Sequence, residues 1–163
     1  QKAADRLLRL LSLTNNAFSS FVTGQVTEAF ILGTLCCLGM LILRLPYALP
    51  VSVIIATLSL IPIFGAWIGA ATGAFLIVFQ SPIKALTFLI FLLILQQVEG
   101  NLIYPKVVGK SVGLPGLWVL AAVTLGGGAF GVLGMLLGVP VCSIVYSLVQ
   151  EFIRGKPAEE SAK

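Results

Sequence analysis

The sequence has 163 residues, of which 58% are hydrophobic and only 10% charged, and its mean hydropathy is +1.08. Soluble domains carry about 25% charged residues, so this chain has too few charges to cover a globule in water. The composition excludes an ordinary soluble protein and indicates a chain embedded in a lipid bilayer. The net charge is a modest +4, and because the basic residues sit at the ends of apolar segments, we expect no nucleic-acid partner.

Only α-helices and closed β-barrels satisfy every backbone hydrogen bond within lipid. A barrel would need short segments of alternating polarity, whereas Phe75–Phe79 and Ala85–Leu95 are apolar runs without that alternation. The sequence therefore predicts an all-α, polytopic integral membrane protein. We expect a helical bundle of about six membrane segments, in which some helices are broken or re-entrant.

The chain begins with charged residues and leucines at helical spacing, which predicts an interfacial amphipathic helix over residues 1–16 that ends near Thr14–Asn16. We expect a transmembrane helical domain over residues 17–153, whose first span ends at Arg44. Residues 154–163 are polar and are expected to be a disordered tail. The first residue is Gln1 rather than Met, so we also expect a piece of a longer protein.

Two long uncharged stretches follow the first span. The stretch Leu45–Ile83 is long enough for two spans, with a divider at Ile61–Gly65, where Pro removes a backbone donor and Gly permits a turn. A fourth segment runs from Lys84 to about Gln97. The stretch Ser111–Gln150 predicts two more segments around a break at Gly126–Gly131, and the first of these is short enough to be re-entrant instead. A re-entrant pair at Pro62 would likewise change the number of crossings.

Six crossings place both termini on the same side of the membrane, and the positive-inside rule then predicts which side this is. Arg44 and Lys84 fall on the opposite side from the termini. The other basic residues fall on the side of the termini: Lys2, Arg6, Arg9, Lys106, Lys110, Arg154, Lys156 and Lys163. We therefore expect a multi-pass protein of the bacterial cytoplasmic (inner) membrane with both termini in the cytoplasm.

Polar residues within apolar segments are the main candidates for a transport site. Glu28 lies well inside the first span, with Gln25 three residues earlier on the same helix face. A carboxylate at a helix centre costs about 2.5–3.5 kcal/mol on insertion scales, so it usually faces the interior of a bundle. The alternative is a Glu close enough to the interface to stay hydrated.

A second polar cluster comes at the end of the fourth segment. It consists of Gln96, Gln97, Glu99 and Asn101, which cover too much of a helix surface for an apolar core. We expect either a functional polar site there or a solvated helix end. The chain has no His and its cysteines lack metal-ligand spacing, so we expect no metal and no cofactor. The sequence contains no recognisable arrangement of enzyme groups, so we expect no enzymatic activity.

Proline and glycine mark possible hinges and packing surfaces. Broken helices at membrane depth usually line cavities or face protein, and our hinge candidates are Pro62, Gly65, Pro105 and Pro140. Glycines recur every four residues, which lets helices approach closely. The packing candidates are Gly65, Gly69, Gly73, Gly127, Gly131, Gly134 and Gly138. These ridges fit packing within one subunit, helix sliding or a subunit interface, and a homo-oligomer is accordingly expected.

Several stretches form motifs in a characteristic order: Gly24-Gln25, Leu60–Gly65 with Ile68-Gly69, Gln97–Pro105, Val108–Gly113 with Leu117-Trp118, and Ala129–Pro140. Together they resemble the autoinducer-2 exporter-like (PerM-type permease) family of membrane proteins. The resemblance covers nearly the whole chain and fits the C-terminal half of the family. Phe64 stands where Tyr is expected, and Pro115 precedes Gly116 where the family often has His-Pro.

The resemblance implies a transporter that exports a small molecule, with an autoinducer-2-like signalling metabolite as the name-giving cargo and possible coupling to cations or protons. Cation/proton antiport is an alternative that it also implies. An oligomeric channel or a membrane scaffold that transports nothing are the remaining alternatives. The expected partners are the lipid bilayer, a small-molecule or ion substrate and other copies of the chain.

Overall fold

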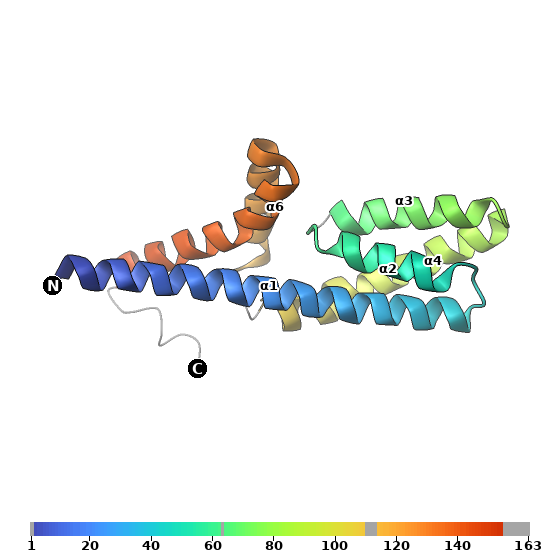
Figure 1. Ribbon diagram of the computed structural model, residues 1–163, viewed down its shortest axis with the longest axis horizontal. Helices are drawn as coiled ribbons and strands as arrows, with labels where there is room; N and C mark the ends of the chain where they lie inside the picture. Colours follow the sequence, from blue (N-terminus) through green and yellow to red (C-terminus); the bar gives the residue numbers. More distant parts are fainter. Residues whose placement is uncertain (1, 63, 110–113, 155–163) are drawn as a thin grey trace. The chain divides into compact units, whose positions relative to one another are not determined.

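A computed structural model describes residues 2–62, 64–109 and 114–154 of the chain. Its helices are α1 (Lys2–Ile42), α2 (Ala48–Ser59), α3 (Phe64–Val78), α4 (Pro82–Val98) and α6 (Gly116–Arg154) (Figure 1). Two π-helical turns, η1 (Glu99–Ile103) and η2 (Pro105–Gly109), follow α4. Within these described ranges there is no β-strand, and the prediction of an all-α helical membrane protein is confirmed.

Three helical stretches are long and apolar enough to cross a bilayer, namely Leu11–Ile42, Pro82–Val108 and Gly116–Gln150. The helices α2 and α3 are also apolar but have only 12 and 15 residues. At 1.5 Å per residue they are about 18 and 22 Å long, shorter than a hydrocarbon core of about 30 Å. Their length favours the re-entrant alternative for the pair that is joined at Pro62.

The chain divides into two compact units, which are described separately. Unit 2 comprises Gly24–Val108, and unit 1 comprises residues 1–23 and 109–163. Within unit 2, α2 and α4 pack against the C-terminal part of α1, since Gly33 of α1 lies against Ala56 and Gly39 lies against Phe91. α3 packs on both α2 and α4.

The core residues of unit 2 recur every three to four positions along α1, α2 and α4. Leu32, Cys36 and Met40 of α1 are at most 1% exposed, and Val51 and Ile55 of α2 meet them. The residues that α4 contributes to this core are Ala85, Phe88, Leu92 and Leu95. This stripe explains why α2 and α4 pack along one side of α1, while the outer faces of the helices carry exposed leucines, valines and phenylalanines suited to lipid.

The glycine ridge of α3 is the contact surface of the hairpin with α2. Gly65, Gly69 and Gly73 are buried. A Cβ on Gly65 would overlap the backbone of Leu58, and one on Gly69 would meet Ile55 at 3.1 Å. The ridge therefore lets α2 and α3 approach within one subunit, which is the first of the alternatives left open by the spacing.

Unit 1 contains a second close helix approach, inside α6. The backbone leaves helical geometry at Phe130 and at Gly131, where φ is 62° and ψ is −141°, a conformation essentially restricted to Gly. A Cβ on Gly126 would overlap the backbone of Gly134, and one on Gly138 would meet the carbonyl oxygen of Ala122 at 2.5 Å. The two halves of α6 thus pack as a hairpin, and the break lies at Phe130–Gly131 whereas the helix continues through Pro140.

The start of the chain differs from expectation in one respect. α1 continues from Lys2 to Ile42 without ending near Thr14–Asn16. Asn15 and Asn16 lie within the helix and do not cap a helix end. The assignment of residues 1–16 to the membrane interface stays a prediction. The expected disordered tail lies outside the described residues apart from Arg154, which is the last residue of α6.

Candidate functional site

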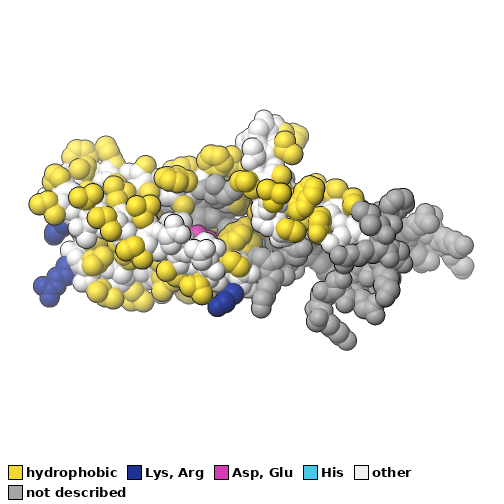
Figure 2. Space-filling view, turned by 180° about the vertical axis from the view of Figure 1, so that it is seen from behind, with side chains coloured by type: hydrophobic (Ala, Val, Ile, Leu, Met, Phe, Trp, Pro, Cys, Tyr) yellow, Lys and Arg dark blue, Asp and Glu magenta, His cyan; other side chains and the backbone are white. Residues whose placement is uncertain are grey.

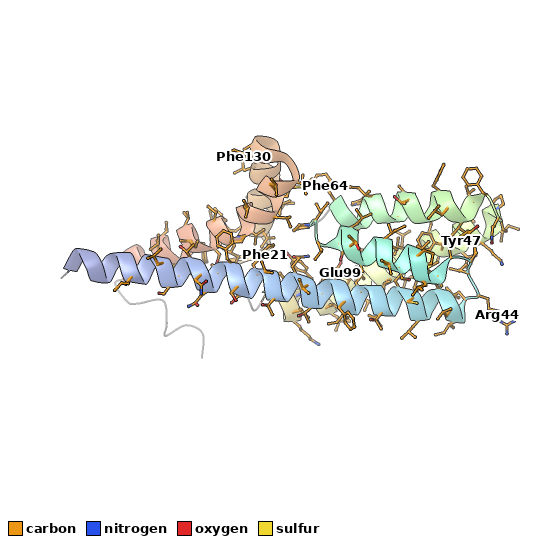
Figure 3. The ribbon with its side chains drawn as sticks, in the orientation of Figure 1. Phe21, Arg44, Tyr47, Phe64, Glu99 and Phe130 are labelled. Atoms are coloured by element: carbon orange, nitrogen blue, oxygen red, sulfur yellow. The ribbon has the colours of Figure 1, made fainter. Side chains whose placement is uncertain are left out.

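Unit 2 contains a cavity of about 540 Å³ next to the break between α2 and α3. Its polar lining comes from every helix of the unit except α3: Gln25 and Glu28 of α1, Ser59 of α2, Gln96 and Gln97 of α4, and Glu99 and Tyr104 beyond α4. Leucines, alanines, Ile61, Pro62 and Trp67 form the rest of the wall. Figure 3 labels Glu99 alongside α1, and Figure 2 shows a small acidic patch in a hollow, with many hydrophobic side chains around it.

The side chain of Gln25 connects α1 to the end of α2. Its Nε2 donates to the main-chain oxygen of Ser59 at 2.9 Å and to Oε2 of Glu28 at 3.2 Å. The last carbonyls of a helix lack donors within the helix, and α2 ends at Ser59 shortly before Pro62. Gln25 and Glu28 are 4% and 2% exposed, so this polar link lies deep in the unit.

The two acidic side chains of the cavity face a common space. Glu28 comes from α1 and Glu99 from the first π-helical residue after α4, and the two carboxyl groups are close enough to repel each other when both are ionised. The residues that line this cavity include no Lys and no Arg. The site therefore places two acidic groups in an apolar surrounding without a basic partner.

The π-helical segment accounts for the way in which Glu99 and Tyr104 reach the same cavity. The backbone N–H of Tyr104 donates to the carbonyl oxygen of Glu99, five residues earlier, which is the pattern of a π-helix. Pro105 has no N–H and its ring disfavours an ordinary α-helical turn at this point. Asn101 adds a side-chain hydrogen bond next to this segment, because its Nδ2 donates to the main-chain oxygen of Gln97 at 2.8 Å.

Two buried polar atoms in the wall have no hydrogen-bond partner, Oε1 of Gln25 and Nε2 of Gln96. Flipping the side-chain amide of Gln25 would not remove the unpaired atom. Its Nε2 donates to two acceptors, and an amide oxygen in the same position would repel both of them. An unpartnered buried group costs about 1–3 kcal/mol. Both unpartnered atoms belong to residues that line the cavity.

Most of the polar residues predicted from the sequence meet here. Gln25, Glu28, Gln96, Gln97 and Glu99 line the cavity, and so does the hinge candidate Pro62. Asn101 is exposed and outside the lining; its amide donates to the main-chain oxygen of Gln97 in α4 instead. Pro105 begins η2, and Pro140 lies in α6 of unit 1.

Among the polar and aromatic lining residues, sequence reasoning missed three, Ser59, Tyr104 and Trp67. Tyr104 follows Glu99 by five residues, a spacing that an α-helix does not place on one face but a π-helix does. Ser59 contributes through its backbone oxygen, which no side-chain pattern reveals. The proximity of Ser59 to the break at Pro62 was the available signal, because a helix end there leaves carbonyls unsatisfied.

Comparison with known protein families decides the affiliation of the chain. The model of the AI-2E family transporter matches residues 1–154. The chain belongs to this family. The resemblance expected from Gly24-Gln25, Gln97–Pro105 and the other motifs is thereby confirmed, and the chain is an integral membrane protein of a transporter family.

Curated relatives carry names of transport proteins and permeases rather than of enzymes. "Putative transport protein YueF" of Bacillus subtilis is 34% identical over 148 residues, which are 90% of this chain and 40% of that protein. "Putative transport protein YrrI" of the same organism is 32% identical over 86% of this chain and 40% of its own length. "Putative permease PerM" of Escherichia coli K12 is 26% identical over 90% of this chain and 42% of its own.

The chain therefore spans about 40% of the length of the curated relatives it matches. No solved structure gave a significant match to it.

Proposed function

We propose that the chain supplies the substrate-binding part of a membrane exporter of small molecules, and that the cavity of unit 2 is the binding site. The observation that carries this proposal is the combination of Gln25, Glu28 and Glu99 around one cavity of about 540 Å³ in an apolar unit. Ligand sites typically have 300–1,000 Å³ and a few convergent polar groups. Broken helices near the membrane midplane are also where transporters place their substrates, and Pro62 puts such a break in this wall.

An autoinducer-2-like signalling metabolite is our first proposal for the cargo. The family name supports it. The wall supports it chemically, because hydroxyl groups both donate and accept and can thus pair with Oε1 of Gln25 and with Nε2 of Gln96.

Cation/proton antiport is the second candidate function. It is favoured by the juxtaposition of Glu28 and Glu99, since two neighbouring carboxyl groups without a basic partner can exchange a proton for a cation. An oligomeric channel or a scaffold without cargo receives less support, because every ridge glycine except Gly131 has close neighbours inside its own unit. The glycine ridges therefore no longer support the prediction of a homo-oligomer, and a subunit interface would have to use another surface.

Filling the cavity tests the proposal. Ala66 lines the cavity, whereas Ala71 on the same helix is exposed and outside the lining. We expect Ala66→Phe in the full-length protein to reduce export of autoinducer-2 from loaded proteoliposomes at least about tenfold, while Ala71→Phe leaves export unchanged. Native export rates with Ala66→Phe would place the transport path outside this cavity. Replacing autoinducer-2 by Na⁺ in the same vesicles, with a pH-sensitive dye inside, distinguishes antiport.

A further inference from the structure

We propose that the cavity of unit 2 selects a protonated organic amine with an apolar body over neutral molecules of the same shape. This inference rests on the proposed function only in that both place a ligand in this cavity, and it names a different ligand class from the hydroxylated, uncharged cargo of our first proposal. It concerns the chemical class of the ligand, which the cavity wall defines by charge, by size and by two unpaired polar atoms.

The charge of the wall comes first. Glu28 and Glu99 are the charged residues of the lining, and no Lys or Arg stands among the residues that form the cavity. The described basic residues of unit 2, Arg44, Lys84 and Lys106, are exposed and outside the lining. The chain contains no His. A neighbouring pair of carboxyl groups in an apolar surrounding lacks a counter-charge, and a cationic ligand supplies it.

The size of the cavity argues against a bare metal ion as its occupant. A volume of about 540 Å³ is in the range of sites for organic molecules. Leu32, Leu89, Leu92 and Leu93 line much of this space and offer hydrocarbon rather than the oxygen ligands that a hard cation requires. Trp67 and Tyr104 add two aromatic rings to the wall, and aromatic faces attract ammonium groups. An amine with an apolar body fits both parts of the wall.

The unpaired atoms provide an independent observation. Gln25 is 4% exposed, and its Oε1 has no partner although its Nε2 is held by Ser59 and Glu28. This acceptor lies beside a carboxyl group, so the N–H groups of one ammonium can pair with both. Nε2 of Gln96 needs an acceptor, which an oxygen atom elsewhere on the ligand would provide.

The test compares two probes with the same skeleton, 2-phenylethylamine, which is protonated at pH 7, and 2-phenylethanol, which is neutral. Binding to the purified full-length protein is measured by isothermal titration calorimetry. We expect the amine to bind at least about tenfold more tightly than the alcohol. Glu28→Gln and Glu99→Gln are each expected to remove that preference, so that the amine and the alcohol then bind with equal affinity. Glu99→Gln keeps the test valid where Glu28→Gln disturbs folding, because Glu99 is only partly buried and outside the Gln25 link.

A matched control separates the cavity from the overall charge. Gln80 is exposed and does not line the cavity, so Gln80→Lys raises the net charge by the same amount as Glu28→Gln and should leave amine binding unchanged. Equal affinities of the two probes in the native protein, or an amine preference that survives both Glu substitutions, would overturn the inference. If either of these results is found while Ala66→Phe still reduces export, the proposed function stands and the amine preference does not. Amine-selective binding in a protein that exports nothing would leave the inference standing and remove the function.

Discussion

The amide nitrogen of Gln25 lies 2.9 Å from the main-chain oxygen of Ser59, and this one hydrogen bond joins the middle of α1 to the end of α2 beside the cavity. We expect Gln25→Leu to lower the free energy of unfolding by about 1–3 kcal/mol, because the Ser59 carbonyl then stays buried without its donor. Thermal unfolding of the purified protein in detergent measures this. Gln97→Leu serves as the control, because Gln97 lines the same cavity but is exposed; equal melting temperatures for the two variants would contradict the account.

The α6 hairpin gives a second prediction. Gly134→Ala places a methyl group against the backbone of Gly126, whereas Gly128→Ala meets nothing within 4 Å. We expect Gly134→Ala to lower the melting temperature and the yield of folded protein, and Gly128→Ala to be neutral or to stabilise by up to about 1 kcal/mol, as Ala usually does in a helix. A Gly134→Ala variant as stable as Gly128→Ala would mean that the two halves of α6 do not pack as described.

Gly131 tests the break itself. A Cβ on Gly131 would meet nothing within 4 Å, yet the residue has a φ of 62° and a ψ of −141°. We therefore expect Gly131→Ala to destabilise by about 1–3 kcal/mol through backbone strain alone, measured by thermal unfolding beside Gly128→Ala. An unchanged stability of Gly131→Ala would indicate a continuous α6 helix.

The orientation in the membrane is a prediction of the charge pattern and is testable by labelling. In a background without Cys36, Cys37 and Cys142, we expect Arg44→Cys and Lys84→Cys to react with a membrane-impermeant maleimide from the periplasmic side. Lys106→Cys should react only after the membrane is permeabilised. Labelling of Arg44→Cys and Lys84→Cys from opposite sides would disprove both the six-crossing and the re-entrant arrangement.

The sequence predicts the membrane class and most of the helix boundaries because charge, Pro and Gly act locally. It also brings Gln25 and Glu28 to one face by their spacing, and the structure shows the hydrogen bond between them. It could not show that the Gly65 ridge meets Leu58, since spacing identifies a smooth face but not its partner. It could not place Tyr104 either, because the π-helix after α4 shifts every later residue relative to an α-helical projection. At Pro140 the sequence predicted a hinge that the structure does not have. The helix α6 continues through this proline, which is buried, because packing can hold a Pro within a helix.

The most direct test of the central claim is export of autoinducer-2 by the full-length protein in proteoliposomes, compared among the native protein, Glu28→Gln and Glu99→Gln. Both carboxyl groups line the cavity that we assign to the substrate. We expect each substitution to slow export at least about tenfold, with Gln80→Lys at the native rate as the control. Native rates in both Glu variants would contradict the assignment of transport to this cavity.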